Sequence, residues 1–168
     1  MLSEIIEKEE YSITTIMKRT ATIKDFVKKW SGRGKEKQDS HPFWEELIES
    51  LFDVKHGRDF LDFEKPVPKP AIVNEGGQSP KYIDCYLKKS KCIIEQKSFN
   101  ISLDKPHAQS DDKMITALEQ AQRYYNYLSQ PDQGRYTIAC NFKEFQIFDN
   151  NHKELKPIFL TQWASFQA

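Results

Sequence analysis

The centre of the chain reads Tyr82-Ile-Asp-Cys-Tyr-Leu-Lys-Lys-Ser-Lys-Cys-Ile-Ile-Glu-Gln-Lys-Ser98. Two mainly apolar runs, 82–87 and 92–97, flank the charged segment 88–91. Short runs that are rich in Ile and Tyr and are bounded by polar turn residues are typical of β-strands. The stretch therefore predicts a β-hairpin, and the other predicted elements precede and follow it.

The register of this hairpin follows from its turn. A turn centred between Lys89 and Ser90 predicts three cross-strand pairs: Leu87 with Cys92, Cys85 with Ile94, and Asp84 with Glu95. Side chains alternate between the two faces of a strand. One face is then apolar and should pack on a core: Ile83, Cys85, Leu87, Cys92 and Ile94. The other face is charged: Asp84, Glu95 and Lys97. A slip by one residue would mix the two faces, which favours this register.

Two opposed carboxylates are costly in a hairpin. Directly opposite residues have Cβ atoms roughly 4.5–5.5 Å apart, and like charges at that distance must share a proton or bind a cation. An acid followed across a hairpin by Glu-x-Lys resembles the active site of the PD-(D/E)xK nucleases. The resemblance implies that Asp84, Glu95 and the carbonyl of Gln96 bind Mg²⁺, with Mn²⁺ as a substitute. It also implies that Lys97 orients the attacking water.

The Glu-x-Lys pattern by itself is weak, because 30% of the residues are charged. It recurs at Glu154-Leu-Lys156, after a predicted turn and with no second strand predicted, where it indicates an exposed surface. The alternative for residues 95–97 is likewise a solvated strand end. The pattern alone leaves the metal site and the solvated end equally open.

Two helices are predicted before the hairpin. The first, Thr20–Trp30, has Thr22 as its cap and apolar residues at the i, i+3, i+4 and i+7 positions of one face. The polar loop 31–40 leads to the second helix, Ser40–Phe52, whose first residue is the predicted N-cap. Pro42 lies in its first turn. This second helix has a wide apolar face: Phe43, Trp44, Leu47, Ile48 and Leu51.

A glutamate on such a helix often completes the metal site of PD-(D/E)xK enzymes. Glu46 lies nearest the edge of the apolar face and is the predicted third acidic ligand. The alternative, an exposed helix acid without a role in metal binding, stays open.

A third helix, Thr116–Leu128, is predicted after the hairpin. Thr116 and Glu119 have the spacing of a capping box. Gln120 and Tyr124 are four residues apart and share one face. Gln-x-x-x-Tyr at this place resembles an accessory motif of several PD-(D/E)xK families, although Tyr124 in a purely packing role is an equal alternative.

The remaining elements complete a mixed sheet. Strands are predicted at 60–67, before the hairpin, and at 135–140 and 144–149, after the third helix. A hairpin followed by a helical crossover and further strands predicts an α/β fold with a mixed sheet. This is the restriction-endonuclease-like core with helices on both faces.

Composition restricts the class of protein. The 168 residues suffice for one domain with its own core, and no apolar run approaches the ~20 residues of a membrane span. The acidic start excludes a signal peptide. The three cysteines lie in apolar runs and the four histidines are scattered, so we expect reduced thiols in a cytoplasmic protein without a zinc site. A net charge of zero is unusual for an isolated non-specific DNA-binding protein.

Residues 20–150 resemble the N-terminal domain of MmeI-like type IIG (IIL) restriction-modification enzymes. The resemblance rests on ten short blocks in order: Phe-Val-Lys-Lys-Trp (26–30), Phe-Trp-Glu-Glu-Leu (43–47), Phe-Glu-Lys-Pro-Val (63–67), Tyr-Ile-Asp-Cys-Tyr (82–86), Ile-Glu-Gln-Lys-Ser (94–98), Leu-Asp-Lys (103–105), Glu-Gln-Ala (119–121), Arg-Tyr (135–136), Cys-Asn-Phe-Lys-Glu-Phe (140–145) and Ile-Phe-Asp (147–149). The chain is thus predicted to comprise an arm (1–19), an endonuclease domain (20–150) and a segment (151–168) that leads to a further domain.

The resemblance implies a Mg²⁺-dependent endonuclease module acting on double-stranded DNA. In that family an S-adenosylmethionine-dependent methyltransferase and a target-recognition domain follow the nuclease. No Asn-Pro-Pro-aromatic methyltransferase motif occurs here. Dimerisation during cleavage stays open. The alternatives are a catalytically inactive PD-(D/E)xK-like domain with a structural or DNA-contacting role, a nuclease for RNA, and an independent repair nuclease.

Overall fold

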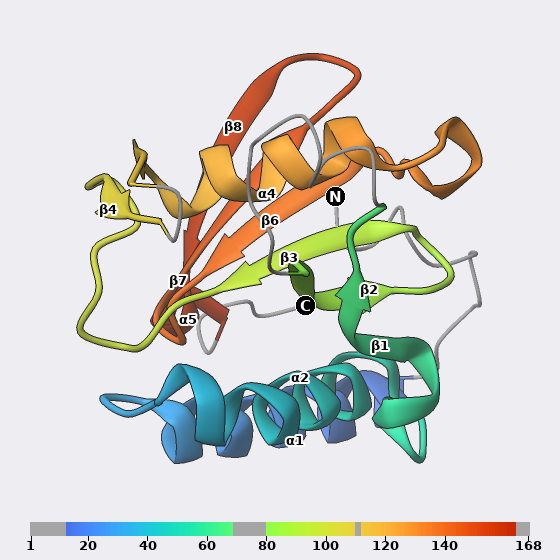
Figure 1. Cartoon of the computed structure of the whole chain (residues 1–168). Coiled ribbons are helices and arrows are strands. Elements are labelled where there is room, and N and C mark those ends of the chain that lie inside the picture. The colour runs from blue at the N-terminus through green and yellow to red at the C-terminus, as the bar shows by residue number, and fades with distance from the viewer. Residues whose placement is uncertain (1–12, 69–79, 110–111, 164–168) are drawn as a thin grey trace.

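A computed structural model describes residues 13–68, 80–109 and 112–163 (Figure 1). A six-stranded sheet with the order β1-β2-β3-β6-β7-β8 forms its centre. The β3–β6 pair is parallel and the other neighbours are antiparallel. The strands are β1 (Leu61–Pro66), β2 (Tyr82–Leu87), β3 (Cys92–Gln96), β6 (Tyr136–Cys140), β7 (Glu144–Asp149) and β8 (Glu154–Phe159). The predicted mixed α/β sheet is confirmed.

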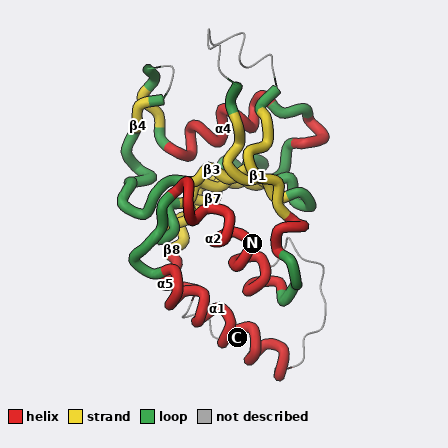
Figure 2. The backbone as a smooth tube through the Cα atoms, turned by 60° about the horizontal axis from the view of Figure 1, so that its bottom comes forward, coloured by secondary structure: helices red, strands yellow, loops and turns green. Residues whose placement is uncertain are grey.

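Helices cover both faces of the sheet, as predicted. The long helices α1 (Ile13–Trp30) and α2 (Glu36–Phe52) lie together on one side, and α4 (Ala117–Tyr127) lies on the other (Figures 1 and 2). The smaller elements are η2 (Gly57–Phe60), η3 (Gln130–Asp132), α5 (Leu160–Trp163) and a ribbon of β4 (His107–Ala108) and β5 (Met114–Ile115). Among the described residues, no helix is long and apolar enough to cross a membrane.

The hairpin has the predicted register. Cys85 pairs with Ile94 and Leu87 with Cys92, and the same register continued by one residue sets Asp84 opposite Glu95. The second face of the hairpin holds more than the predicted Asp84, Glu95 and Lys97. Tyr86 and Ile93 on that face are buried beneath α4, because β3 is a central strand that is covered on both sides.

Ile83 also departs from the predicted alternation. It is fully buried and groups with Tyr86 and Ile93 instead of with Cys85. On the neighbouring strand, Glu64 has a φ of 53°, a left-handed conformation that interrupts the regular pleat between the pairs on either side of it.

The two N-terminal helices begin earlier than predicted. Because α1 begins at Ile13, Thr22 lies within the helix and is not its cap. Because α2 begins at Glu36, Pro42 lies in the helix interior rather than in the first turn. The α1–α2 loop is tight: Gly34 has a φ of 142°, and any side chain there would overlap the ring of Phe142. The loop therefore ends sooner than its polar composition indicates.

The C-terminal segment belongs to the sheet and the core. β8 pairs along β7, so the prediction of no strand around Glu154 is wrong. Leu160 and Trp163, in the segment predicted to lead to a further domain, are buried, and the Trp163 ring stacks on Phe145 with centroids 4.7 Å apart. The three cysteines are buried and free, as expected. Most of residues 68–81, between the predicted strand at 60–67 and the hairpin, lie outside the described residues.

Candidate functional site

The predicted charged residues come together at the end of β3. Asp84 lies on β2 and Glu95 on the adjacent strand β3. The backbone N–H of Lys97 donates to the carbonyl of Cys140 at 2.7 Å, so the extended chain continues one residue beyond β3. Side-chain alternation then directs Lys97 to the same face as Glu95. Their contact confirms this geometry: Lys97 Nζ lies 2.7 Å from Glu95 Oε1.

The predicted accessory pair on α4 joins the same group. Lys97 Nζ donates to Gln120 Oε1 at 3.2 Å, and Gln120 Nε2 donates to the Tyr124 hydroxyl at 3.4 Å. The capping box of Thr116 and Glu119 starts α4, as predicted, and so sets the helical position of Gln120. Tyr124 is also buried against the sheet, so the packing alternative and the polar contact both hold.

Burial dominates the electrostatics of the two acids. Burial raises the pKa of Asp84 from an ordinary 3.8 to about 6, although the N–H of Gln96 donates to Asp84 Oδ2 at 2.7 Å and opposes the rise. Burial, reinforced by the charge of Asp84, raises the pKa of Glu95 well above its usual range. Both carboxylates are thus unstable as free anions and favour either a proton or a cation.

Lys97 is the nearest cation. Its own burial lowers the pKa of Lys97, but the charge of Glu95 and the hydrogen bond to it outweigh burial and raise the pKa above its ordinary value. Lys97 therefore remains protonated at neutral pH. The pKa of the Tyr124 hydroxyl is raised by burial, although its hydrogen bond with Gln120 opposes the shift.

One carboxylate oxygen of Glu95 has no hydrogen-bond donor. Glu95 is 2% exposed and its Oε2 atom is buried, while the Glu95 and Asp84 carboxyl groups lie within hydrogen-bonding reach of each other, which opposes the rise in the Asp84 pKa. Within the described residues, no three His, Cys, Asp or Glu side chains form a metal-binding group. Mg²⁺ is usually bound by one or two carboxylates and keeps several waters, so the chemistry of a pair such as Asp84 and Glu95 fits this ion.

The helical acid near this group is Glu36, not Glu46. The Glu46 carboxylate accepts hydrogen bonds from Lys29 and from Trp30 Nε1 at 3.0 Å, both on α1, and is not brought to the site. Glu36 shifts the pKa values of Asp84, Glu95 and Lys97 through its charge.

Glu36 was missed because residues 31–40 were predicted to be a loop. Its backbone N–H donates to Ser98 Oγ at 3.0 Å, immediately after Lys97, which ties the start of α2 to the site. Gly32 and Gly34 followed by two acids, Glu36 and Asp39, is a helix-start signal that could have found it.

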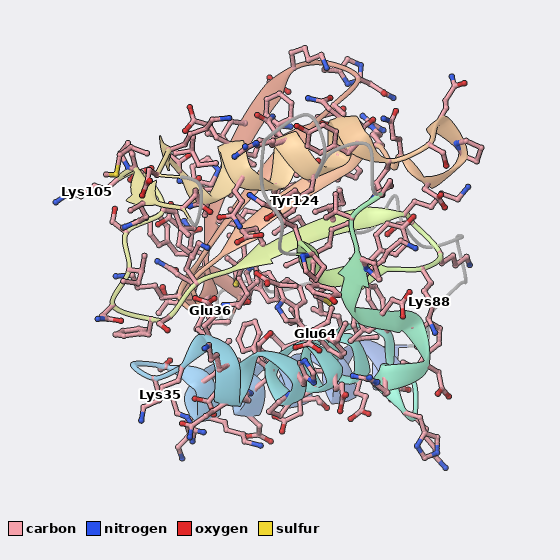
Figure 3. The ribbon with its side chains drawn as sticks, viewed as in Figure 1. Lys35, Glu36, Glu64, Lys88, Lys105 and Tyr124 are labelled. Carbon is pink, nitrogen blue, oxygen red and sulfur yellow. The ribbon has the colours of Figure 1, made fainter. Side chains whose placement is uncertain are left out.

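A hollow of about 460 Å³ opens beside Lys97. Glu36 lines it from the helix layer below the sheet and Tyr124 from the layer above (Figure 3). Its further walls include Gln120 and the segment around His107, on the β4–β5 ribbon. The site is therefore accessible from one side, where polar side chains predominate.

Comparison with known proteins gives a match to one family model. The family model described as MmeI, N-terminal domain, matches residues 18–165, which is most of the chain and includes every residue of the site. No curated protein and no solved structure gave a significant match. The predicted domain boundaries at residues 19/20 and 150/151 stay predictions.

Proposed function

The chain belongs to the MmeI N-terminal domain family. We propose that it is a Mg²⁺-dependent DNA endonuclease module of a type IIG restriction-modification protein. The observation that carries the proposal is the buried Oε2 of Glu95, which has no hydrogen-bond donor and lies next to the half-buried carboxyl group of Asp84. Two acids that burial disfavours as anions are suited to a divalent cation.

The site residues take distinct roles in this proposal. Asp84, Glu95 and the backbone carbonyl of Gln96 hold the ion. When bound, Mg²⁺ supplies Lewis-acid activation of water and of the phosphodiester. Lys97, which stays protonated, orients the attacking water and offsets negative charge at the scissile phosphate.

The neighbouring side chains support those roles. Gln120 accepts from Lys97 and so restrains the ammonium group, while Tyr124 restrains Gln120. Glu36 replaces Glu46 as the proposed third acid, acting through water or directly from the rim of the hollow. These assignments for Glu36, Gln120 and Tyr124 are proposals that rest on proximity and charge.

The proposed substrate is double-stranded DNA, entering from the hollow beside Lys97. A net charge of zero gives this chain little non-specific attraction for DNA. We therefore propose that the downstream methyltransferase and target-recognition domains of a full-length enzyme supply the affinity for DNA and the sequence specificity. S-adenosylmethionine would bind only to such a methyltransferase.

One observation favours the alternative of an inactive scaffold. Lys97 forms a direct ion pair with Glu95, one of the two proposed ligands, and this pair competes with a cation for Glu95 Oε1. The second oxygen, Oε2, is free of that competition. Metal binding is thus the property that separates an active site from a scaffold.

The test is Mn²⁺ binding, measured by calorimetry and by anomalous diffraction from soaked crystals, with and without a DNA duplex. We expect Mn²⁺ at Asp84 and Glu95 in the wild type and its loss in Asp84→Ala. Glu154→Ala, which removes an exposed acid of the second Glu-x-Lys triplet, is the matched control and should bind as the wild type does. A folded wild type that binds no Mn²⁺ under either condition would overturn the proposal.

A further inference from the structure

Gln96, between Glu95 and Lys97, makes a set of contacts that the proposed mechanism does not use. The residue is fully buried, and its side chain extends toward α2, where its Oε1 accepts from Trp44 Nε1 at 2.8 Å. Glu95 and Lys97 project to the opposite face of the strand. The residue thus links the end of β3 to the helix layer on the other side of the sheet.

The same residue also contacts two of the three candidate catalytic residues. Its side-chain Nε2 donates to the carbonyl of Lys97 at 2.9 Å. Its backbone N–H donates to Asp84 Oδ2 at 2.7 Å. The Gln96 backbone therefore binds Asp84 and the Gln96 side chain binds the backbone of Lys97. Both contacts act on the strand end that carries Glu95.

A polar residue is unexpected at this position. Its neighbours on that face, Ile94 and Cys140, belong to the large apolar core, and burying an amide there is costly unless every polar atom is paired. The amide of Gln96 is paired on both its oxygen and its nitrogen. Trp44 is itself held by edge-to-face contacts with Phe43 and Phe145, so its N–H is aimed by rigid packing.

We infer that Gln96 is a positioning residue and that Trp44 is its anchor. The indole N–H fixes the Gln96 amide, and that amide fixes the backbone from which Glu95 and Lys97 project. The effect of Gln96 on metal binding rests on the proposed function. The effect of Gln96 and Trp44 on the rigidity of the strand end is independent of that proposal, because it follows from the hydrogen bonds alone.

The test uses three single variants of the full chain and one double variant, Gln96→Met combined with Trp44→Phe. Gln96→Met removes the amide at similar size, and Trp44→Phe removes the N–H but keeps an aromatic ring. Thr137→Val is the matched control: it removes a buried hydroxyl, hydrogen-bonded to Asn150, from the adjacent strand β6. Two properties are measured: Mn²⁺ affinity by calorimetry, and amide hydrogen exchange at position 96 without metal.

We expect Gln96→Met to weaken Mn²⁺ binding by about 10- to 100-fold, as removal of a ligand's supporting contact commonly does. Trp44→Phe should accelerate exchange of the position-96 amide by about tenfold, because the strand end opens more often. The double variant should lose no more Mn²⁺ affinity than Gln96→Met alone, because both changes remove the same hydrogen bond, from Trp44 Nε1 to Gln96 Oε1. Thr137→Val should leave both properties within about twofold of the wild type.

Two results would overturn the inference. One is an unchanged exchange rate at position 96 in Trp44→Phe. The other is a loss of Mn²⁺ affinity in Thr137→Val equal to that in Gln96→Met, which would mean that general destabilisation explains both. A wild type without Mn²⁺ binding would instead overturn the proposed function, and the exchange rates would still decide whether Trp44 and Gln96 hold the strand end.

Discussion

Two Glu-x-Lys triplets in this chain have the same local pattern and very different surroundings. Glu95-Gln96-Lys97 ends the central strand β3, and Glu154-Leu155-Lys156 begins the edge strand β8. Each triplet has an aspartate across its hairpin, Asp84 for the first and Asp149 for the second. Each also contains an ion pair, with N–O distances of 2.7 Å and 3.8 Å.

Burial and neighbouring cations separate the two triplets. The Glu95 side chain is 2% exposed and that of Glu154 is 63% exposed. Burial of its carboxyl raises the pKa of Asp84, whereas the Arg135 guanidinium, with help from His152, holds the pKa of Asp149 far below its usual value. Arg135 and His152 therefore stabilise the charge of Asp149, while Oε2 of Glu95 in the first triplet has no hydrogen-bond donor.

The largest expected effect comes from removing the lysine of each triplet, Lys97 or Lys156. Lys97→Ala should abolish measurable cleavage of DNA, a loss of at least about a hundredfold to a thousandfold, because it removes the ammonium group that lies 2.7 Å from Glu95 Oε1. Lys156→Ala should cleave as the wild type does, since its ion pair is exposed and worth little. Cleavage is measured with Mg²⁺ on duplex DNA, using a longer protein that retains the downstream domains.

The outcome is informative only if both variants fold. Far-ultraviolet circular dichroism and denaturation midpoints of the two lysine variants should lie close to those of the wild type, or Lys97→Ala should be slightly less stable. Lys97→Ala cleaving at the wild-type rate would contradict the role assigned to Lys97, and equal losses in both variants would remove the distinction between the triplets.

The two aspartates should respond to pH with opposite signs. In the folded, metal-free protein Asp84 holds its proton up to about pH 6, whereas the unfolded chain releases it near pH 4. Stability should therefore fall as the pH rises through this window, by on the order of 2–3 kcal/mol from Asp84. Asp84→Asn should remove that fall, because asparagine still accepts the Gln96 N–H without a charge to bury.

Asp149→Asn should act in the opposite direction. The lowered pKa of Asp149 means that its ionised form stabilises the fold above about pH 4, and that this contribution is lost as the pH falls. The variant should be less stable than the wild type at pH 7, and the difference should shrink in acid. Urea denaturation in chelator at about pH 2.5, pH 4.5 and pH 7 measures both effects, with the two higher values testing Asp84 and the lowest testing Asp149. Shifts of the same sign in the two variants would refute the electrostatic contrast.

The hairpin shows how much of the site the sequence can predict. Alternation of apolar and charged residues predicted the pairs Cys85–Ile94 and Leu87–Cys92, and therefore the meeting of Asp84 with Glu95. The spacing of Thr116 and Glu119 predicted where α4 begins. Both predictions rest on contacts within a hairpin or a helix turn, so short-range patterns contain the information. The contact of Gln120 with Lys97 joins residues 23 apart, and only the resemblance to an accessory motif singled out Gln120.

Other features depend on contacts between distant segments. β8 contains Pro157 and has mostly exposed side chains, so its strand is visible only through its pairing with β7. Trp44 and Gln96 form a hydrogen bond although they are 52 residues apart, and nothing in the local sequence around either residue predicts this contact. Charge patterns also leave the choice among several helical acids open, and helix spacing alone favoured Glu46, which pairs with α1.

The comparison of Glu36 with Glu46 is the finest test of the site. Glu36→Gln removes a negative charge that acts on Asp84, Glu95 and Lys97, and should weaken Mn²⁺ binding by about tenfold, as loss of a supporting group does. Glu46→Gln changes a group that hydrogen-bonds Lys29 and Trp30 away from the metal, so it should alter stability slightly and Mn²⁺ affinity not at all. Calorimetric titrations of the two variants measure both affinities. An equal loss in both would mean that overall negative charge attracts the ion, whereas a loss confined to Glu36→Gln would place the start of α2 in the metal site.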